Sequence, residues 1–552
     1  MAQQENSGSL FKKYDVPLMA VSLAIIGAMV LGFTMFPEEG NALARKVMYL
    51  LTHTLGSPMQ VLSFGILVFL VGLAFSKYGD IRLGKTKPDY KLISWVAMMF
   101  FCGNGAGTVY WAFLEWGYHF NAAPMLNGVP YSEAYTYELA LAYCFFDWGP
   151  LPWALLCVFV LPFAYHYHVK KDTELRFSAL CKYTVGEKRT KGWFGRVVDF
   201  IFIFSAVGSI CITAGTSAST IAEALASLIG IPYSFSLSVI VLLGVALLYS
   251  VSSLLGIEKG MRRISDWNVY FCAAMLGFIL IVGPGQFILD SIVNSIGIML
   301  GQFVRMTTWT DPVAASSYPQ DWTVFYFVYW FVFGPFTGLF VAKISRGRKL
   351  KEVIINMLVT GSCGLFTFFG IITAYQQKMR IEGLLDVPAM LADGRSQGIA
   401  EATLNTLPLP GPITILYLVV IVLFLATTLD ATSFALSSTV SKGLKNNEEP
   451  TRSMKLAWCL VLVALPLAIT FAGTNINTIK SIVIATGMPL VVILGITYHG
   501  LLKEMKKDYG HYSRTEILDF GDPDMPDKVI VIANAKNGSE ASASNETSST
   551  TA

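Results

Sequence analysis

Residues 92–118 read LISWVAMMFFCGNGAGTVYWAFLEWGY. This stretch is long and apolar enough to cross a bilayer as a helix, because about 20 such residues span the hydrocarbon core. Its middle contains three glycines, Gly103, Gly105 and Gly107, and glycine weakens a helix. Broken backbone at membrane depth is tolerated only where it is buried in protein or lines a wet cavity. The stretch therefore predicts a spanning helix that is interrupted for a functional reason.

Apolar runs of this kind recur along the chain. Of 552 residues, 54% are hydrophobic and 14% are charged, whereas soluble domains carry about a quarter charged residues. Soluble and disordered classes are excluded, and 40 Lys+Arg against 37 Asp+Glu give no excess of charge that would indicate nucleic acid as a partner. The pattern predicts an all-α polytopic membrane protein with twelve transmembrane helices, near residues 16–36, 57–75, 92–118, 139–166, 197–229, 235–256, 266–284, 322–342, 353–374, 411–440, 456–472 and 481–501.

The basic residues predict how the chain is oriented. Most Lys and Arg residues fall in the two tails and in alternate loops, as the positive-inside rule describes. We therefore expect a cytoplasmic tail at 1–15, a transmembrane transporter domain at 16–501, and a cytoplasmic tail at 502–552 that is disordered at its end. Residues 286–306 are amphipathic, and we expect them outside as an interfacial or partner-contacting helix.

A second interruption is predicted in the eighth span, where Gly334 precedes Pro335. Proline removes one hydrogen bond of the helix. Paired interruptions in two halves of a transporter point to its binding site. Spans 3 and 8 are five apart, which predicts two five-helix repeats, spans 3–7 and 8–12, after two N-terminal helices. The alternative is close helix packing through small residues.

Aromatic residues gather beside both expected breaks. The candidate rings are Trp148 and Trp153 in DWGPLPW (147–153), and Tyr329, Trp330 and Phe333 in span 8. Such rings attract a quaternary ammonium group through cation–π contacts of about 0.5–2 kcal/mol each, without needing a carboxylate. The alternative is ordinary packing together with an interfacial aromatic belt.

Three carboxylates are expected within the membrane, at Glu115, Asp147 and Asp430. A charge there costs about 2.5–3.5 kcal/mol even on an insertion scale, so each needs a partner or water. Asp147 is a candidate to sense a substrate cation beside Trp148, and the alternative is a salt bridge. None of the six histidines groups with acids at metal-ligand spacing, so neither an enzyme nor a resident cofactor is predicted.

These motifs resemble those of the betaine/carnitine/choline transporter family, across nearly all of residues 14–505. DWGPLPW resembles the family's Trp-Gly-Pro-Leu-Pro-Trp element, and residues 321–348 resemble its most specific signature. The resemblance implies a LeuT-like inverted-repeat core, a homotrimer, and a place in the bacterial inner membrane. It also implies alternating-access import of a zwitterionic quaternary-ammonium or sulfonium compound, such as betaine, carnitine, a choline-like compound or dimethylsulfoniopropionate.

The same resemblance implies which residues bind. Its aromatic box falls on Trp148, Trp153 and Trp330, with further rings at Tyr118 and Tyr329. The sequence also departs from the family pattern. Asp147 stands where histidine is usual, Leu156 where a box tyrosine is expected, and Tyr329 where tryptophan is frequent. The pocket is therefore predicted to be closer to the carnitine and dimethylsulfoniopropionate side of the family than to its strict glycine betaine carriers.

The coupling ion is left open by the resemblance. Phe424, Thr427 and Thr428 align with a sodium site of sodium-coupled members, and Phe336 with part of a second. We favour sodium symport, with the ion at Thr427 and Thr428. The alternative is a sodium-independent carnitine/γ-butyrobetaine antiporter, because Arg262 aligns with the arginine that such exchangers use instead of sodium. A channel is a remote alternative.

Overall fold

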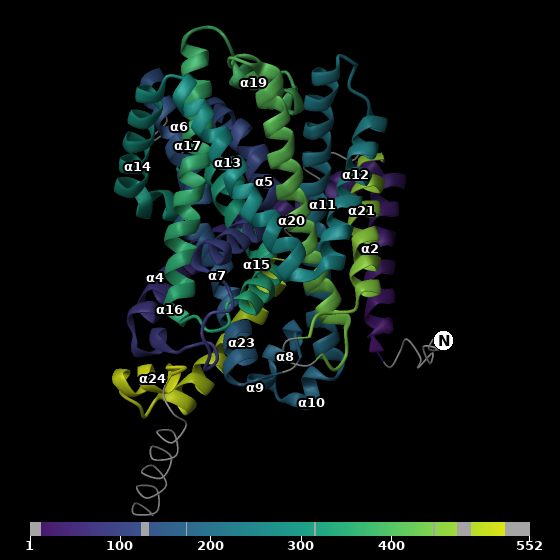
Figure 1. The fold of residues 1–552 in the computed structure, drawn as a ribbon, viewed down its shortest axis with the longest axis vertical. Coiled ribbons are helices and arrows are strands. Elements are labelled where there is room, and N and C mark those ends of the chain that lie inside the picture. The colour runs from purple at the N-terminus through teal and green to yellow at the C-terminus, as the bar shows by residue number, and fades with distance from the viewer. Residues whose placement is uncertain are drawn as a thin grey trace, which may run out of the picture.

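The computed structural model describes residues 13–122, 132–172, 174–313, 316–444, 448–471 and 487–524. Within these ranges the chain is helical, and the β-pairing is confined to two isolated bridges, Tyr14 with Ser441 and Arg82 with Lys349 (Figure 1). The predicted all-α class is confirmed. The helices run mostly parallel to one another, as expected for a membrane bundle.

The long helices are α2 (Val16–Met35), α4 (Gly56–Phe75), α5 (Leu92–Ala122), α6 (Glu133–Trp148), α7 (Pro150–Ala164), α11 (Trp193–Ile229), α12 (Phe235–Gly256), α13 (Arg262–Val282), α14 (Gly285–Thr308), α15 (Phe325–Ile344), α17 (Ser362–Ile381), α20 (Pro410–Val440), α21 (Arg452–Phe471) and α23 (Gly487–Tyr509). Apart from α14, the long helices follow the predicted spans in order, and α6 and α7 divide the span predicted at 139–166.

Short helices connect or extend the long ones. They are α3 (Pro37–Tyr49), η1 (Leu50–Thr54), η2 (Lys77–Asp80), η3 (Tyr165–Val169), α8 (Phe177–Leu180), α9 (Lys182–Val185), α10 (Glu187–Thr190), η4 (Ile257–Met261), η5 (Gln320–Val324), α16 (Leu350–Ile355), η6 (Asn356–Gly361), α18 (Val387–Ala392), η7 (Ser396–Gly398), α19 (Ile399–Asn405) and α24 (Arg514–Gly521).

In the described part of the chain, nine helices are long and apolar enough to cross a membrane, or ten when the bent halves of α5 count as one span. One of the nine is α14, the predicted interfacial helix. Parts of the spans expected at 456–472 and 481–501 lie outside the described residues. The count of twelve therefore stays a prediction.

The centre of the bundle is the pair α7 and α15, which lie against each other in Figure 1 and are buried along almost their whole length. Two glycines of α15 allow this approach. A Cβ added at Gly334 would lie 2.1 Å from the Phe159 ring, and one at Gly338 would lie 2.8 Å from the Phe159 backbone. Close packing through small residues is thus what these glycines provide.

The predicted break at Gly334-Pro335 is wrong. Helix α15 continues through both residues, with Pro335 inside it. A proline costs a helix one hydrogen bond, and neighbouring helices in a membrane bundle compensate for such a loss. The argument for two repeats from paired breaks loses this support, and the inverted repeat stays a prediction.

The two ends of the described chain lie at the same end of the bundle, near the loops at the bottom of Figure 1. The Asp15 backbone N–H donates to the Val440 carbonyl at 2.8 Å, so the start of the chain meets the end of α20. Helix α24 is held against η2, because Arg514 pairs with Asp80 at 2.6 Å. Lys351 pairs with the same carboxylate at 2.6 Å.

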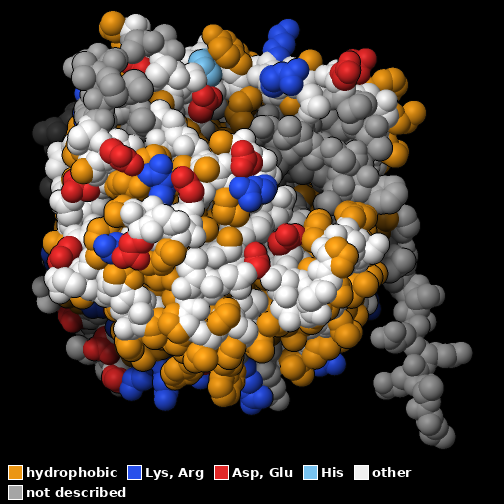
Figure 2. Space-filling model, turned by 90° about the horizontal axis from the view of Figure 1, so that it is seen from above, with side chains coloured by type: hydrophobic (Ala, Val, Ile, Leu, Met, Phe, Trp, Pro, Cys, Tyr) orange, Lys and Arg blue, Asp and Glu red, His pale blue; other side chains and the backbone are white. Residues whose placement is uncertain are grey.

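The opposite end of the molecule carries charges of both signs (Figure 2). Ion pairs among its side chains include Arg380 with Glu133 at 3.0 Å and with Asp386 at 3.1 Å. Helix α14 packs on α6 and α17 at the edge of the bundle. It turns an apolar row outward, formed by Leu289, Val293, Leu300 and Val304.

Candidate functional site

The glycine-rich stretch of α5 is broken in the structure. Gly105 has φ +47° and ψ −155°, far from helical values. The two halves of the helix, Leu92–Cys102 and Gly107–Ala122, meet at 61°. The broken turn faces α20, since a Cβ added at Gly105 would lie 2.0 Å from the Thr428 hydroxyl oxygen. The surroundings of Gly103 lie outside what the structure describes.

A second break separates α6 from α7. Gly149 ends one helix and begins the next with ψ −149°, and Pro150 occupies the first position of α7. Proline suits this position, because the first helical N–H has no partner within the helix. Trp148 is thereby the last residue of α6, directly before this interruption.

Trp148 and Trp330 form the centre of a buried aromatic cluster. Their ring centroids are 5.1 Å apart and their planes stand at 85°. Four more rings complete the cluster, which we call the ring cluster: Tyr326, Tyr329 and Phe333 of α15, and Phe369 of α17. The sequence prediction did not include Phe369, because nothing in the pattern relates α17 to these spans.

Both indole N–H groups of the pair are held by the protein. Trp148 Nε1 donates to Glu115 Oε2 at 2.7 Å, and Trp330 Nε1 donates to the Asp147 carbonyl at 3.1 Å. Tyr326 donates its hydroxyl to the same Glu115 oxygen. These bonds fix the orientation of both indoles and leave their faces for apolar or cation–π contacts.

Two of the predicted rings lie apart from the central pair. Trp153 stacks on Phe100 with 6.1 Å between ring centroids, and a Cβ added at Gly361 would lie 2.3 Å from its indole. Trp153 therefore lies towards η6 and the α5 break. Tyr118 is 5.6 Å from Trp322, and Trp322 in turn stacks on Tyr326 at 6.3 Å. Tyr118 thus borders the ring cluster through an intermediate ring.

The structure corrects the statement that no histidine groups with acids. His119 Nε2 lies 3.4 Å from Glu115 Oε1 and 3.4 Å from Asp147 Oδ2, and all three side chains are fully buried. Tyr318 contacts the other ring nitrogen, Nδ1, at 2.8 Å. We call Glu115, His119 and Asp147 the acid–histidine trio. Glu115 and His119 are four residues apart, a spacing that places them on one helix face. The sequence signal was therefore present for that pair.

Glu115, His119 and Cys144 are residue types that can bind a metal ion, and they lie close together beside the ring cluster. Ligand atoms of Glu115, His119 and Cys144 lie within 4.8 Å of one another. The Glu115 oxygens and the His119 nitrogens are already occupied as hydrogen-bond or ion-pair partners of Trp148, Tyr326, Tyr318 and Asp147. Because the donors are in use, we assign no metal to them.

The residues predicted for ion coupling are distributed over three places. Thr428 donates to the Phe424 carbonyl at 3.0 Å and to the Phe101 carbonyl at 3.4 Å, next to the α5 break. Thr427 donates to the Leu423 carbonyl at 2.8 Å. The Phe424 ring packs on Phe101, with 4.7 Å between centroids.

Phe336 and Arg262 lie elsewhere. Phe336 borders the ring cluster, 5.6 Å from the Phe333 ring. Arg262 begins α13 and pairs with Asp266 of its own helix at 3.7 Å, with about a third of each side chain exposed. The structure therefore does not bring Arg262 to the ring cluster or to the α5 break.

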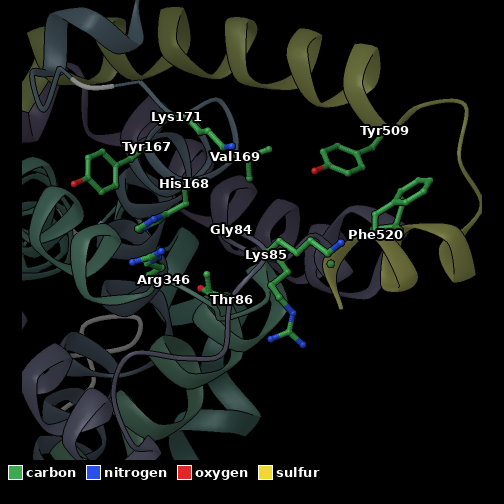
Figure 3. A pocket seen from close by; sticks show the side chains of 13 residues that line it. Gly84, Lys85, Thr86, Tyr167, His168, Val169, Lys171, Arg346, Tyr509 and Phe520 are labelled. Atoms are coloured by element: carbon green, nitrogen blue, oxygen red, sulfur yellow. The ribbon is translucent and has the colours of Figure 1, made fainter. Parts of the chain in front are cut away.

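A separate pocket of about 350 Å³ lies at the loop end of the bundle (Figure 3). Its lining includes the basic side chains Arg82, Lys85, Lys171 and Arg346. None of the predicted site residues lines this pocket, so it is distinct from the ring cluster.

Residues 17–510 match the model of a family described as betaine/carnitine/choline family transporters. The chain belongs to this family. It is 34% identical over 495 residues to a carnitine transporter of Acinetobacter baumannii, covering 90% of each chain. It is 35% identical over 454 residues to the uncharacterized transporter YeaV of Escherichia coli K12, covering 82% of this chain and 92% of that one.

One solved structure is similar at a lower level. It is a Na⁺-coupled sialic acid symporter in a substrate-bound, outward-open state, 16% identical, covering 82% of this chain and 92% of that chain with a TM-score of 0.41. A likeness at this level says nothing about substrate or coupling ion. Family membership makes the protein a multi-pass membrane transporter and confirms the resemblance read from its motifs.

Proposed function

We propose that the protein is a secondary active transporter that imports a zwitterionic quaternary-ammonium or sulfonium compound by alternating access. The perpendicular, buried pair of Trp148 and Trp330 carries the proposal. Its indole N–H groups are bound by the protein, so the ring faces are fixed in place for a methylated headgroup. Each ring contributes about 0.5–2 kcal/mol through cation–π contact.

Carnitine is the first candidate substrate, because a relative covering 90% of this chain is named a carnitine transporter. Betaine, choline-like compounds and dimethylsulfoniopropionate share the onium headgroup and are the other candidates. Trp148, Trp330, Tyr329 and Phe333 are proposed to contact the headgroup, with Asp147 beside them. Trp153 and Tyr118 are proposed to line the routes on either side.

Sodium is proposed as the coupling ion, at Thr427 and Thr428. Hydroxyl and carbonyl oxygens are the ligands that hard cations prefer, and Thr428 adjoins the broken backbone at Gly105. The alternative, a sodium-independent antiporter, needs Arg262 to replace the ion. The ion pair of Arg262 with Asp266 at the start of α13 gives this alternative no support.

The setting proposed for the protein is a bacterial inner membrane, with both termini in the cytoplasm and three copies in a trimer. Relatives from two bacteria support the first part. The common location of the start of the chain and α24 at one end of the bundle supports the second (Figure 1). The outward apolar row of α14 is the surface proposed for contacts between copies or with lipid.

The test is uptake of radiolabelled carnitine, betaine and dimethylsulfoniopropionate by proteoliposomes, for Trp330→Leu against wild type. Loss of one ring is expected to weaken apparent affinity about 2- to 30-fold, since it removes about 0.5–2 kcal/mol. Trp458→Leu is the matched control, because Trp458 is equally buried but lies in α21. The proposal is wrong if Trp330→Leu behaves like the control for every substrate.

The same vesicles separate the modes of transport. Sodium symport predicts that uptake requires an imposed sodium gradient. An antiporter would instead need substrate loaded inside the vesicles and would ignore sodium. A channel would show neither saturation nor counterflow.

A further inference from the structure

The acid–histidine trio contains more acceptors than donors. His119 Nε2 faces a carboxylate oxygen of Glu115 and one of Asp147, at 3.4 Å each. A single ring nitrogen carries at most one proton, so the two acids share at most one N–H between them. Glu115 is satisfied in other ways, because Trp148 and Tyr326 both donate to its second oxygen.

Asp147 is in the opposite situation. Neither of its carboxylate oxygens accepts a hydrogen bond, although the side chain is fully buried. An ionised carboxylate in such a place is strongly disfavoured unless it is paired. The trio therefore retains a proton, either on the Asp147 carboxyl group or as a charged His119 beside it.

The other titratable groups around the trio do not supply a positive charge. Those facing it are Tyr118 of α5, Tyr143 and Cys144 of α6, Tyr318 before η5, and Tyr326 and Tyr329 of α15. All are neutral or acidic side chains. Within the part of the chain that the structure describes, His119 is the cationic partner that lies within ion-pair distance of Glu115 and Asp147.

The trio is joined directly to the ring cluster. Glu115 accepts from the Trp148 indole, and the Asp147 main chain accepts from the Trp330 indole. A positive headgroup held against these indoles would lie close to the Glu115 carboxylate and to Asp147, whose side chains are fully buried. A headgroup and a proton on the trio therefore repel each other, because charges interact strongly at low dielectric.

We propose that the acid–histidine trio is a proton-binding site that exchanges its proton for the onium headgroup. When the headgroup binds, the O–H bond of Asp147 or the N–H bond of His119 breaks, and the proton passes to solvent water. One positive charge replaces another, so the net charge of the buried site is unchanged. The inference rests on the proposed function, because it needs an onium group at the ring cluster.

The test is isothermal titration of purified protein with carnitine and with tetramethylammonium, from pH 5.5 to 8.5. Tetramethylammonium has the headgroup and no carboxylate, so it removes the substrate's own acid from the comparison. Each titration is repeated in two buffers of different ionisation enthalpy, which gives the number of protons released. We expect close to one proton to be released for each headgroup bound. In the pH range where the free trio carries this proton, Kd is expected to fall by up to about tenfold for each unit by which the pH rises.

Variants separate a proton site from a merely structural role. Asp147→Asn is expected to abolish proton release and flatten the pH dependence, and Asp147→Glu is expected to restore both. Asp393→Asn is the control for the same chemical change, since its carboxylate is 63% exposed and pairs with Arg395. If Asp147→Asn does not fold, His119→Gln tests the same site and is expected to flatten the pH dependence too.

Two results would overturn the inference. One is binding by the wild type without proton release in either buffer. The other is an Asp147→Asn variant whose Kd differs from that of the wild type by the same factor at every pH, so that the dependence of Kd on pH is unchanged. If neither probe binds at any pH, and betaine and dimethylsulfoniopropionate do not bind either, the proposed function itself fails, so the two failures are distinguishable.

Discussion

Replacing Gly105 by alanine tests the break in α5. The backbone there has φ +47° and ψ −155°, a region that is essentially closed to residues with a Cβ. Holding alanine in such a conformation costs about 1–3 kcal/mol. The break cannot relax into a helix at no cost, because the two halves of α5 are fixed at 61° by their packing.

A second penalty comes from the neighbouring helix. The new Cβ would lie 2.0 Å from Thr428 Oγ1 and 3.0 Å from its Cβ and Cγ2. Overpacking of this kind costs about 1–3 kcal/mol. Together with the backbone penalty, Gly105→Ala is expected to lose about 2–6 kcal/mol of unfolding free energy.

A double-mutant cycle divides the two penalties. Thr428→Ala removes the hydroxyl and the methyl group that the new Cβ would meet, so it should recover the overpacking part of the loss, about 1–3 kcal/mol. The backbone part should remain. The assay is reversible unfolding of purified protein in mixed micelles, followed by circular dichroism.

The control variant is Gly107→Ala, two residues away, where an added Cβ meets nothing within 4 Å. It should be as stable as wild type or more stable, because alanine favours a helix over glycine by about 0.5–1 kcal/mol. The reasoning is refuted if Gly105→Ala matches Gly107→Ala in stability, or if Thr428→Ala rescues it completely.

Two further predictions concern other contacts. Gly334→Ala is expected to lose about 1–3 kcal/mol in the same assay, because its Cβ would meet the Phe159 ring at 2.1 Å; an unchanged stability would contradict the packing described. At Asp80, burial opposes ionisation, but Lys351 and Arg514 outweigh it and hold the pKa below its usual value. The stability that the ionised Asp80 carboxylate contributes is therefore present above about pH 3.9 and is lost as pH falls through the lowered pKa. Limited proteolysis should find α24 released at that acidic pH, and at pH 7 in Asp80→Asn; protection of α24 in that variant would count against the ion pairs.

The helical class and the order of the spans could be predicted because apolar runs of membrane length have few other solutions. The break at Gly105 could be located for a similar reason, since several glycines in one turn weaken a helix. The break predicted at Gly334 and Pro335 was wrong because the same residue types also occur where two helices pack closely. Only the neighbour, Phe159, distinguishes the two uses, and it lies on another helix.

The candidate site was also predicted only in part from the sequence. Trp148 and Trp330 were predicted from motifs, and the structure places their rings together. Trp153 follows Trp148 by five residues, which places the two side chains on different sides of a helix, and its ring packs on Phe100 instead. His119 was missed because its relation to Asp147 crosses from α5 to α6, and no periodicity within one helix records such a contact.

The close fit between α7 and α15 limits how this protein can change shape. Gly334 and Gly338 seat α15 on Phe159 with no room for a methyl group, so the two helices cannot slide past each other without colliding. We therefore expect them to move as a single rigid body if the protein works by alternating access. Bending is then expected at the interruptions at Gly105 and Gly149, which lie next to residues proposed to bind the substrate.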